Sequence, residues 1–336
     1  MKICIVRSDR MGDMVLTLPV IQGIKQKNPQ AIIHVVASQK NLKICKQFSL
    51  IDKIYEKTTS SSAFSNLTKL ISAEKYDYYF SFNPGWYGLF LGFFSKSKFK
   101  SSLILKSRYK SNVFSKFWQI IFSKIFFSIS LVINRFQSLE TKENIHQTIM
   151  MMDVVSKSKL AISENIKTEF TFTNVFTLKK DEPNKFICVI HLSSKWINNY
   201  YSEDDFEDLL RSLKHKNISI YLTSDETTKN KFSKIFNIYP VIDNPNNLHE
   251  NTGNILICNN FDFENWTSLI NQANYVITPE SGCTHIASLT KCKLAVIYDA
   301  DNSPNSIRQE YAPWNKEYLA FETNDKELNQ KLLNFI

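Results

Sequence analysis

The segment Arg7-Ser-Asp-Arg-Met-Gly-Asp13 gathers four charged side chains between an apolar run and a helical pattern. We expect Gly12 to let the chain turn tightly and Asp13 to stand where the helix begins. Asp13 could simply cap that helix, but a cap does not need so many neighbouring charges. The carboxylate could instead accept a proton from a hydroxyl group, and general-base help of this kind accelerates a reaction by about 10²–10⁴.

A second loop, Thr278-Pro-Glu-Ser-Gly-Cys-Thr-His285, leaves an apolar run and enters a short helical pattern through Gly282. Backbone N–H groups at a helix start point outward, and the helix contributes about +0.5 charge there, so a diphosphate could be held without a metal. Ser281 and Thr284 add hydroxyl donors. His285 could add a charge-assisted hydrogen bond, although a single histidine here is as often a local hydrogen-bonding group. This loop is a predicted anion site.

Two further loops carry weaker signals. Residues 191–196 contain three side chains that could bind phosphate oxygens, namely Ser193, Ser194 and Lys195. Lys195 would be the point charge that steadies a departing diphosphate, but an ordinary surface lysine is an equal alternative. Glu226 ends the segment 222–226, where a carboxylate could bind a ribose or a base.

Each of these loops follows a predicted strand. In the first half we expect strands at 2–6, 32–36, near 54 and at 78–82, with helices at 14–27, 42–48, 63–72 and 142–155. In the second half we expect strands at 186–191, 218–222, 254–257, 275–278 and 294–298, with helices at 204–214, 227–236, 263–271 and 284–289. Strands that alternate with helices in this way predict α/β domains with parallel, doubly wound sheets.

The length of 336 residues favours two domains, because one core rarely serves so long a chain. We place an N-terminal Rossmann-like domain at 1–165, a second at 175–325 and a C-terminal helix at 326–336. The two domains should face a cleft, since such sheets bind ligands outside the carboxyl ends of their strands.

Composition narrows the class of protein. The chain is 43% hydrophobic and 22% charged, which argues against a disordered or an integral membrane protein. The six cysteines form no C-x-x-C pair and no zinc-ligand spacing, so we expect reduced, structural thiols and see no indication of a metal. Charged residues follow the first apolar run too soon for a signal peptide, and we expect a cytoplasmic protein.

The net charge of +9 comes from one segment. Residues 78–139 contain no Asp or Glu but nine basic residues, and the remaining 32 basic residues match the 32 acidic ones. The basic residues include Lys96, Lys98 and Arg108. Eighteen of the 44 aromatic residues also lie there. This mixture suits the headgroup region of an anionic membrane, and we interpret residues 84–136 as a basic-aromatic insertion, mostly helical, on the first sheet.

Other interpretations of that segment stay open. A spanning helix at 117–136 is disfavoured because polar residues and Lys124 interrupt the apolar run. Single-stranded nucleic acid also binds aromatic and basic side chains, but no nucleic-acid-binding signature accompanies them. The aromatic residues could equally form a core beneath a solvated lysine face.

The loops together resemble glycosyltransferase family 9, the ADP-heptose:lipopolysaccharide heptosyltransferase family, which has a GT-B fold. The N-terminal signature R-x-D-R-x-G-D-x-x-x-x-x-P is similar to the run from Arg7 to Pro19, and D-[ST]-G-x-x-H-[LIV]-A-[AS] is similar to Glu280–Ser288. The resemblance implies an inverting glycosyltransferase that moves a heptose or related sugar from a nucleotide diphosphate to a lipid-linked lipopolysaccharide core. It implies a peripheral protein of the inner membrane, without a cofactor and without nucleic acid as a partner.

The resemblance also implies roles for individual residues. Asp13 would deprotonate the acceptor hydroxyl. The donor would be bound by Ser193, Ser194, Lys195, Glu226, Glu280, Ser281, Gly282, Thr284 and His285. The acceptor would be bound by Arg7, Arg10, Gly12, Lys96, Lys98 and Arg108.

Three positions depart from the family pattern: Glu280 replaces the usual Asp, Asn198-Asn199 replaces a Lys before a Trp-Pro pair, and Ser224-Asp225 replaces a glycine-rich turn. They motivate one rival, a catalytically silent paralogue that binds nucleotide sugar or lipid oligosaccharide. A second rival, a sugar-nucleotide epimerase of the same two-domain architecture, also stays open. An oxidoreductase is set aside because no G-x-G-x-x-G turn follows the first strand.

Overall fold

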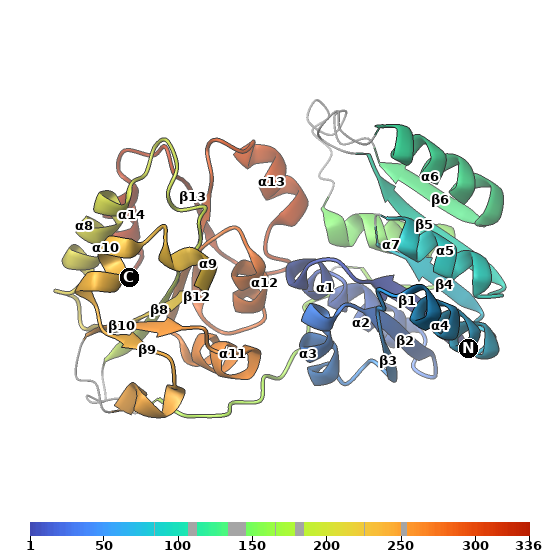
Figure 1. The fold of residues 1–336 in the computed structure, drawn as a ribbon, viewed down its shortest axis with the longest axis horizontal. Coiled ribbons are helices and arrows are strands. Elements are labelled where there is room, and N and C mark those ends of the chain that lie inside the picture. Colours follow the sequence, from blue (N-terminus) through green and yellow to red (C-terminus); the bar gives the residue numbers. More distant parts are fainter. Residues whose placement is uncertain are drawn as a thin grey trace. The chain divides into compact units, whose positions relative to one another are not determined.

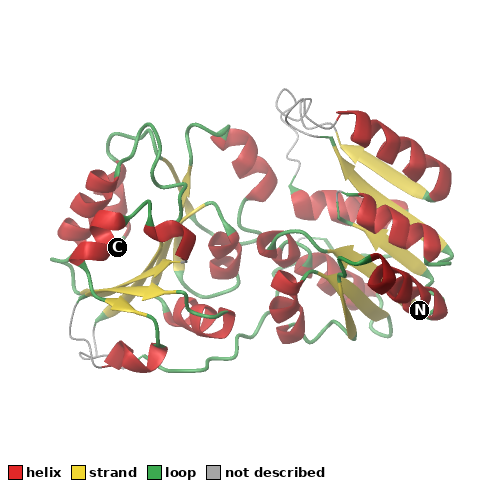
Figure 2. Ribbon diagram, in the orientation of Figure 1, coloured by secondary structure: helices red, strands yellow, loops and turns green. Residues whose placement is uncertain are grey.

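The computed structural model describes residues 1–83, 85–106, 113–133, 146–164, 166–178, 185–224, 226–249 and 254–336. The chain divides into two compact units, Met1–Phe170 and Thr171–Ile336. Each unit consists of one parallel sheet with helices on its faces (Figures 1 and 2). No helix within the described ranges is long and apolar enough to cross a membrane.

Unit 1 contains a six-stranded sheet in the order β3-β2-β1-β4-β5-β6, with all neighbours parallel. Its strands are β1 (Lys2–Arg7), β2 (Ile32–Ala37), β3 (Lys53–Glu56), β4 (Tyr78–Ser81), β5 (Phe99–Leu105) and β6 (Ile129–Ile133). Its helices are α1 (Met11–Val15), α2 (Leu18–Lys27), α3 (Gln39–Gln47), α4 (Ser61–Ala73), α5 (Trp86–Phe94), α6 (Val113–Phe126) and α7 (Gln147–Lys157). Helix α5 contacts both α4 and α6. Helix α2 contacts α7, and α1 contacts α3.

Unit 2 contains a seven-stranded sheet in the order β13-β12-β11-β7-β8-β10-β9. Its strands are β7 (Phe186–His191), β8 (Ile218–Ser224), β9 (Val241–Ile242), β10 (Ile255–Asn259), β11 (Tyr275–Pro279), β12 (Lys293–Tyr298) and β13 (Leu319–Glu322). Its helices are α8 (Glu203–Leu213), α9 (Glu226–Lys229), α10 (Ser233–Ile238), the 3₁₀ helix η2 (Pro245–His249), α11 (Phe263–Gln272), α12 (Gly282–Ser288), α13 (Pro304–Tyr311) and α14 (Leu328–Phe335).

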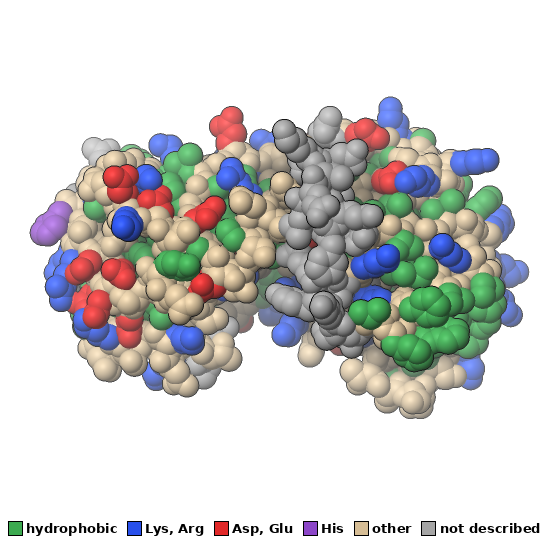
Figure 3. All heavy atoms as spheres, turned by 90° about the horizontal axis from the view of Figure 1, so that it is seen from above, with side chains coloured by type: hydrophobic (Ala, Val, Ile, Leu, Met, Phe, Trp, Pro, Cys, Tyr) green, Lys and Arg blue, Asp and Glu red, His purple; other side chains and the backbone are tan. Residues whose placement is uncertain are grey.

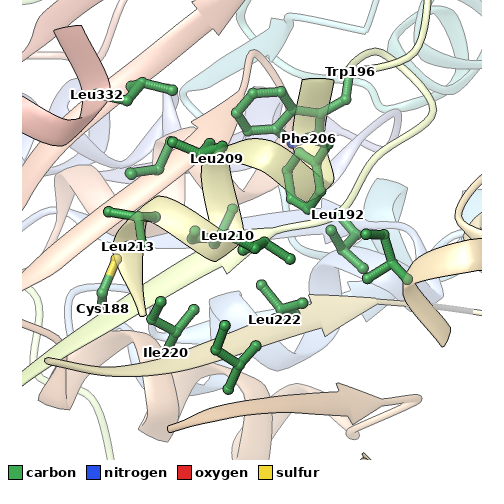
Figure 4. Packing of buried hydrophobic residues seen from close by; sticks show 14 of the residues in the cluster. Cys188, Leu192, Trp196, Phe206, Leu209, Leu210, Leu213, Ile220, Leu222 and Leu332 are labelled. Atoms are coloured by element: carbon green, nitrogen blue, oxygen red, sulfur yellow. The ribbon is translucent and has the colours of Figure 1, made fainter. Parts of the chain in front are cut away.

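In the core of unit 2, helix α8 packs beneath the loop that follows β7. Phe206, Leu210 and Leu213 on α8 are completely buried against β7 and β8 (Figure 4). Trp196 packs its ring on Phe206 at a centroid distance of 5.0 Å, and its Nε1–H donates to the carbonyl oxygen of His191 at 2.9 Å. A buried ring with a satisfied N–H holds the end of this loop in one position.

The structure corrects the interpretation of residues 84–136. The segment is no helical insertion, because it contributes β5 and β6 to the sheet and continues the strand–helix alternation. The apolar run that begins near residue 117 divides into the end of α6 and the strand Ile129–Ile133. Such a short apolar run fits a buried strand as well as a helix, so its sequence alone does not distinguish the two.

Smaller differences concern helices. The single helix expected at 14–27 is two helices, α1 and α2, and the one expected at 227–236 is α9 and α10. Two elements near the C-terminus, α13 and β13, had no counterpart in the expectation.

Candidate functional site

Both sheets have the same topological switch point. In unit 1 the first strand, β1, lies between β2 and β4, and in unit 2 the first strand, β7, lies between β8 and β11. The chain first adds strands on one side of the first strand and later adds strands on its other side, so the loops on the two sides diverge there. Ligands of doubly wound sheets bind where the loops diverge at such a point. The loops of interest therefore follow β1 and β4 in unit 1, and β7 and β11 in unit 2.

In unit 1, Arg7 connects the two loops of the switch point. Its side chain is only 1% exposed, and its Nη1–H donates to the carbonyl oxygen of Phe82, directly after β4, at 2.5 Å. Its Nη2–H donates to Oδ1 of Asp13 at 2.7 Å, and its Nε lies 3.0 Å from Oδ1 of Asp9. Asn41 on α3 donates to the carbonyl oxygen of Arg7 at 3.3 Å. Arg7 thus orients two carboxylates from beneath the surface.

The two carboxylates differ in their surroundings. Burial raises the pKa of Asp9 to about 6; Arg7 opposes this shift and the neighbouring Asp13 adds to it. The side chain of Asp13 is 11% exposed, so a ligand can reach it, while Arg7 holds one of its oxygens. A carboxylate held in one rotamer at the carboxyl end of a central strand can act as a proton acceptor.

The local structure corrects the expected backbone of this loop. Asp13 is not the N-cap of α1, because the helix begins at Met11 and Arg10 is its N-cap residue. Gly12 is buried inside the helix, and no glycine in the described residues has a positive φ. Gly12 is therefore not a turn residue. Arg10 itself is exposed next to the two carboxylates.

In unit 2, Lys195 connects the two loops of the switch point. Its ammonium group lies 2.5 Å from Oε2 of Glu280 and also donates to the carbonyl oxygen of Glu280, directly after β11. Lys195 is 41% exposed and Glu280 is 16% exposed. Ser193 and Ser194 precede Lys195 between the buried Leu192 and Trp196, which fix both ends of the loop.

The loop after β11 uses its own hydroxyl groups. Ser281 caps α12 by accepting the N–H of Cys283 at 3.2 Å. Thr284 is completely buried; its hydroxyl accepts the N–H of Ser281 and donates to the carbonyl oxygen of Pro279 at 3.1 Å. We therefore revise the prediction for Thr284, whose hydroxyl shapes the loop. His285 is also buried, at 3% exposure, whereas Glu280, Ser281 and Gly282 are partly exposed.

The sequence analysis missed a second connection in unit 2. Asn198 donates from Nδ2 to Oδ1 of Asp299 at 3.1 Å and to Oγ1 of Thr323 at 2.9 Å. Its Oδ1 accepts the N–H groups of Tyr200 and Tyr201. The residues that depart from the family pattern thus connect the loop after β7 to the loops after β12 and β13. The Asn-Asn pair was visible in the sequence, but the partners of Asn198 lie 101 and 125 positions away.

The basic residues predicted to bind the acceptor do not share one site. Lys96 and Lys98 precede β5, so they lie at the amino edge of the parallel sheet, opposite to the loop that carries Asp13. Lys98 is paired with Asp77 at 2.7 Å. Arg108 and the side chain of Glu226 lie outside the described residues. In the described part of the chain, no group of three His, Cys, Asp or Glu residues is arranged to hold a metal ion.

The chain has two α/β units, and each is built on a parallel sheet with polar loops at its switch point. This architecture matches the GT-B fold of solved heptosyltransferase structures. ADP-heptose LPS heptosyltransferase II of E. coli has a TM-score of 0.73 and 11% identity over 100% of this chain and 97% of that one. E. coli heptosyltransferase WaaC with ADP has a TM-score of 0.69 and 13% identity over 100% of both chains. UDP-GlcNAc 2-epimerase from Methanocaldococcus jannaschii has a TM-score of 0.53 and 13% identity over 100% of this chain and 91% of that one.

The sequence gives the narrower assignment. The model of glycosyltransferase family 9 (heptosyltransferase) matches residues 65–332. No curated protein sequence matches the chain. The chain belongs to glycosyltransferase family 9, and it is a glycosyltransferase. The resemblance drawn from the two signature loops is confirmed.

Proposed function

We propose that this enzyme transfers a heptose or related sugar from a nucleotide diphosphate to a lipid-linked lipopolysaccharide core, with inversion at the anomeric carbon. Family membership supports the reaction class, and the similar E. coli heptosyltransferase WaaC was solved with ADP, which supports a nucleotide diphosphate donor. The observation that carries the proposal is Asp13, held by the buried Arg7 at the carboxyl end of the central strand and still reachable from solvent.

The proposed step is a displacement. The acceptor hydroxyl oxygen attacks the anomeric carbon while Asp13 takes the hydroxyl proton, and the bond between that carbon and the diphosphate oxygen breaks. The nucleotide diphosphate leaves with the bonding electrons. Positive charge develops on the sugar and negative charge on the leaving group, so orientation and neutralisation of the diphosphate are the main tasks of the protein.

Unit 2 would bind the donor. Lys195 supplies an exposed positive charge, Ser193 and Ser194 flank it, and the partly exposed Ser281 and Gly282 lie on the neighbouring loop across the switch point. When a diphosphate binds, it would take the place of Glu280 as the partner of Lys195. Glu280 would then be able to accept hydrogen bonds from the hydroxyl groups of the donor sugar. Thr284 and His285 would support this loop from its buried side.

The test is a transfer assay with ADP-heptose, a panel of other nucleotide sugars and a lipid-linked core oligosaccharide. We expect Asp13→Asn to lower kcat by about 10²–10⁴ while ADP binding, measured by calorimetry, stays unchanged. Asp153→Asn, on the exposed side of α7, is the matched control and should retain full activity. If the Asp13→Asn variant still transfers sugar at the wild-type rate, Asp13 is not the general base.

The same assay separates the two rivals. An epimerase would convert a nucleotide sugar without any acceptor present. A silent paralogue would bind nucleotide sugar and transfer it to nothing. Either result would overturn the proposed reaction.

A further inference from the structure

Helices α5 and α6 in unit 1 expose several large aromatic side chains. On α6 the buried residues are the polar Gln119 and Ser123, whereas Phe114 is 76% exposed, Phe117 55% and Trp118 47%. Ser123 hydrogen-bonds Ser130 of β6 at 2.6 Å. A helix on the surface of a globular protein normally buries its apolar stripe and exposes its polar one. The inverted arrangement of α6 needs a partner for the outer stripe.

Helix α5 buries Leu89 and Leu91, and it also places two glycines against the sheet. A Cβ atom at Gly92 would lie 2.5 Å from the ring of Tyr79 and 2.7 Å from the ring of Phe127, so only glycine allows this close approach. Gly88 also faces the sheet, and its carbonyl oxygen accepts the hydroxyl of Tyr79 at 2.6 Å. With glycines on the inner side, Phe90 and Phe93 point outward, at 41% and 37% exposure.

The exposed rings of the two helices form one surface. Phe93 contacts Phe126 at a centroid distance of 4.8 Å, and Phe114 contacts Trp118 at 6.1 Å. We call this surface the aromatic face, and it consists of Phe90, Phe93, Phe114, Phe117, Trp118 and Phe126. Figure 3, viewed from the side on which α6 lies in Figure 1, shows a continuous group of hydrophobic side chains bordered by Lys and Arg. Contiguous apolar surface with a polar border marks an interaction site.

Charge at the border selects the partner. Lys106 follows β5 at one end of the aromatic face, Lys96 follows α5 at the other end, and Lys124 lies on the last turns of α6; all three are exposed. Residues 78–139 contain nine basic side chains and no acidic one. A second copy of this chain would bring the same positive border against itself, and like charges oppose such pairing. A partner that combines apolar groups with negative charge would cover the rings and pair with the lysines.

We propose that the aromatic face docks on an anionic phospholipid bilayer, with its rings at the level of the headgroups and acyl chains and its lysines on lipid phosphates. Aromatic rings with a basic border are the composition that lies at such an interface. The exposed aliphatic Val113 and Ile125 on the same helix favour acyl chains over the stacked bases of a nucleic acid. The proposal relies on the proposed function only for the view that the bilayer carries the acceptor.

Vesicle sedimentation tests the surface without donor or acceptor, so failure here and failure of sugar transfer are separate results. We expect the full chain to bind vesicles of phosphatidylglycerol and phosphatidylcholine, to bind pure phosphatidylcholine weakly, and to dissociate as salt is added. Lipids brominated on the acyl chain should quench the fluorescence of Trp118, and Trp118→Phe should lower that quenching. Wild-type protein that stays off anionic vesicles would overturn the proposal.

Two variants test the two components. Phe114→Gln with Trp118→Gln should weaken vesicle binding about tenfold or more, with an unchanged Tm because both side chains are exposed. The control is Leu70→Gln with Leu319→Gln, which removes two apolar side chains exposed elsewhere. Lys106→Glu with Lys124→Glu should weaken binding about fivefold or more per charge. Its control, Lys214→Glu with Lys291→Glu, makes the same change of net charge in unit 2.

Three results would contradict the proposal. In the first, the ring variant binds vesicles as tightly as its control. In the second, sedimentation velocity detects a dimer of the wild type that the ring variant loses, which would make a second copy the partner. In the third, a single-stranded oligonucleotide binds with the same dependence on the rings while vesicles do not.

Discussion

The switch points of the two units share one kind of contact, but the side chain that makes it is buried in unit 1 and partly exposed in unit 2. In each unit a basic side chain donates to the carbonyl oxygen directly after the neighbouring strand: Arg7, the last residue of β1, to Phe82, and Lys195, after β7, to Glu280. Arg7 is 1% exposed and Lys195 is 41% exposed. The first connection is part of the interior of unit 1, whereas the second lies where a ligand can compete for it. The same topology therefore holds a carboxylate beside a buried cation in one unit and places a partly exposed cation in the other.

The choice of side chain follows from this difference. Arg7 has donors in a rigid planar fork, which hydrogen-bond Asp13 and the carbonyl oxygen of Phe82 while the same guanidinium forms an ion pair with Asp9. Lys195 carries a compact charge on a flexible stem, which can move from a carboxylate to a phosphate. A guanidinium suits a permanent junction, and an ammonium suits a site that exchanges partners.

The largest effect is expected when the buried connection is removed. Arg7→Met leaves Asp9 and Asp13 without their cation in a poorly solvated site, and breaking a buried pair in this way costs about 3–5 kcal/mol of unfolding free energy. Lys195→Met is the matched variant in unit 2 and should change the unfolding free energy by less than about 1 kcal/mol. Urea unfolding followed by circular dichroism measures both. Equal losses of unfolding free energy in the two variants would contradict the proposed difference between the two connections.

A smaller effect concerns Asp9, which has no counterpart on the loop after β7. Its pKa is about 6 in the folded protein against an ordinary value of 3.8, so the folded state binds more protons between these values. The contribution of Asp9 to stability is therefore complete below the lower value and is lost as pH rises through the upper one. Two units of pKa correspond to at most about 3 kcal/mol.

Asp9→Asn should remove this slope. The difference in unfolding free energy between wild type and Asp9→Asn should change as pH rises through the interval between the two pKa values, whereas the difference between wild type and the surface variant Asp153→Asn should not. Thermal or urea unfolding over that pH range gives both differences. Parallel profiles for wild type and Asp9→Asn would mean that Asp9 carries no raised pKa.

The sequence predicted the strands that carry both switch points, because apolar runs followed by polar loops identify the carboxyl end of a buried strand. It also predicted Asp13 and Lys195 as polar groups of those loops. It did not predict their partners, because Phe82 and Glu280 lie 75 and 85 positions away from Arg7 and Lys195, and only the order of the strands brings them close. A one-dimensional pattern identifies strands more readily than their neighbours in the sheet.

The helical insertion expected at 84–136 was wrong because the short apolar runs of β5 and β6 fit a buried strand as well as a helix. A helix with apolar residues on one side is normally read as burying that side, yet α6 buries Gln119 and Ser123 and exposes its rings. Under the proposed membrane contact, lipid would cover the exposed rings of this helix.

The last prediction tests whether the exposed connection in unit 2 is exchangeable. Lys195→Met should weaken ADP binding by about tenfold or more, because a charge-assisted hydrogen bond contributes about 1.5–3 kcal/mol, and Lys195→Arg should retain much of the affinity. Lys291→Met removes an exposed lysine elsewhere in unit 2 and is the control. Titration calorimetry with ADP measures all three. If Lys195→Met binds ADP like the wild type, Lys195 only joins the two loops, and the donor phosphates must find their positive charge elsewhere.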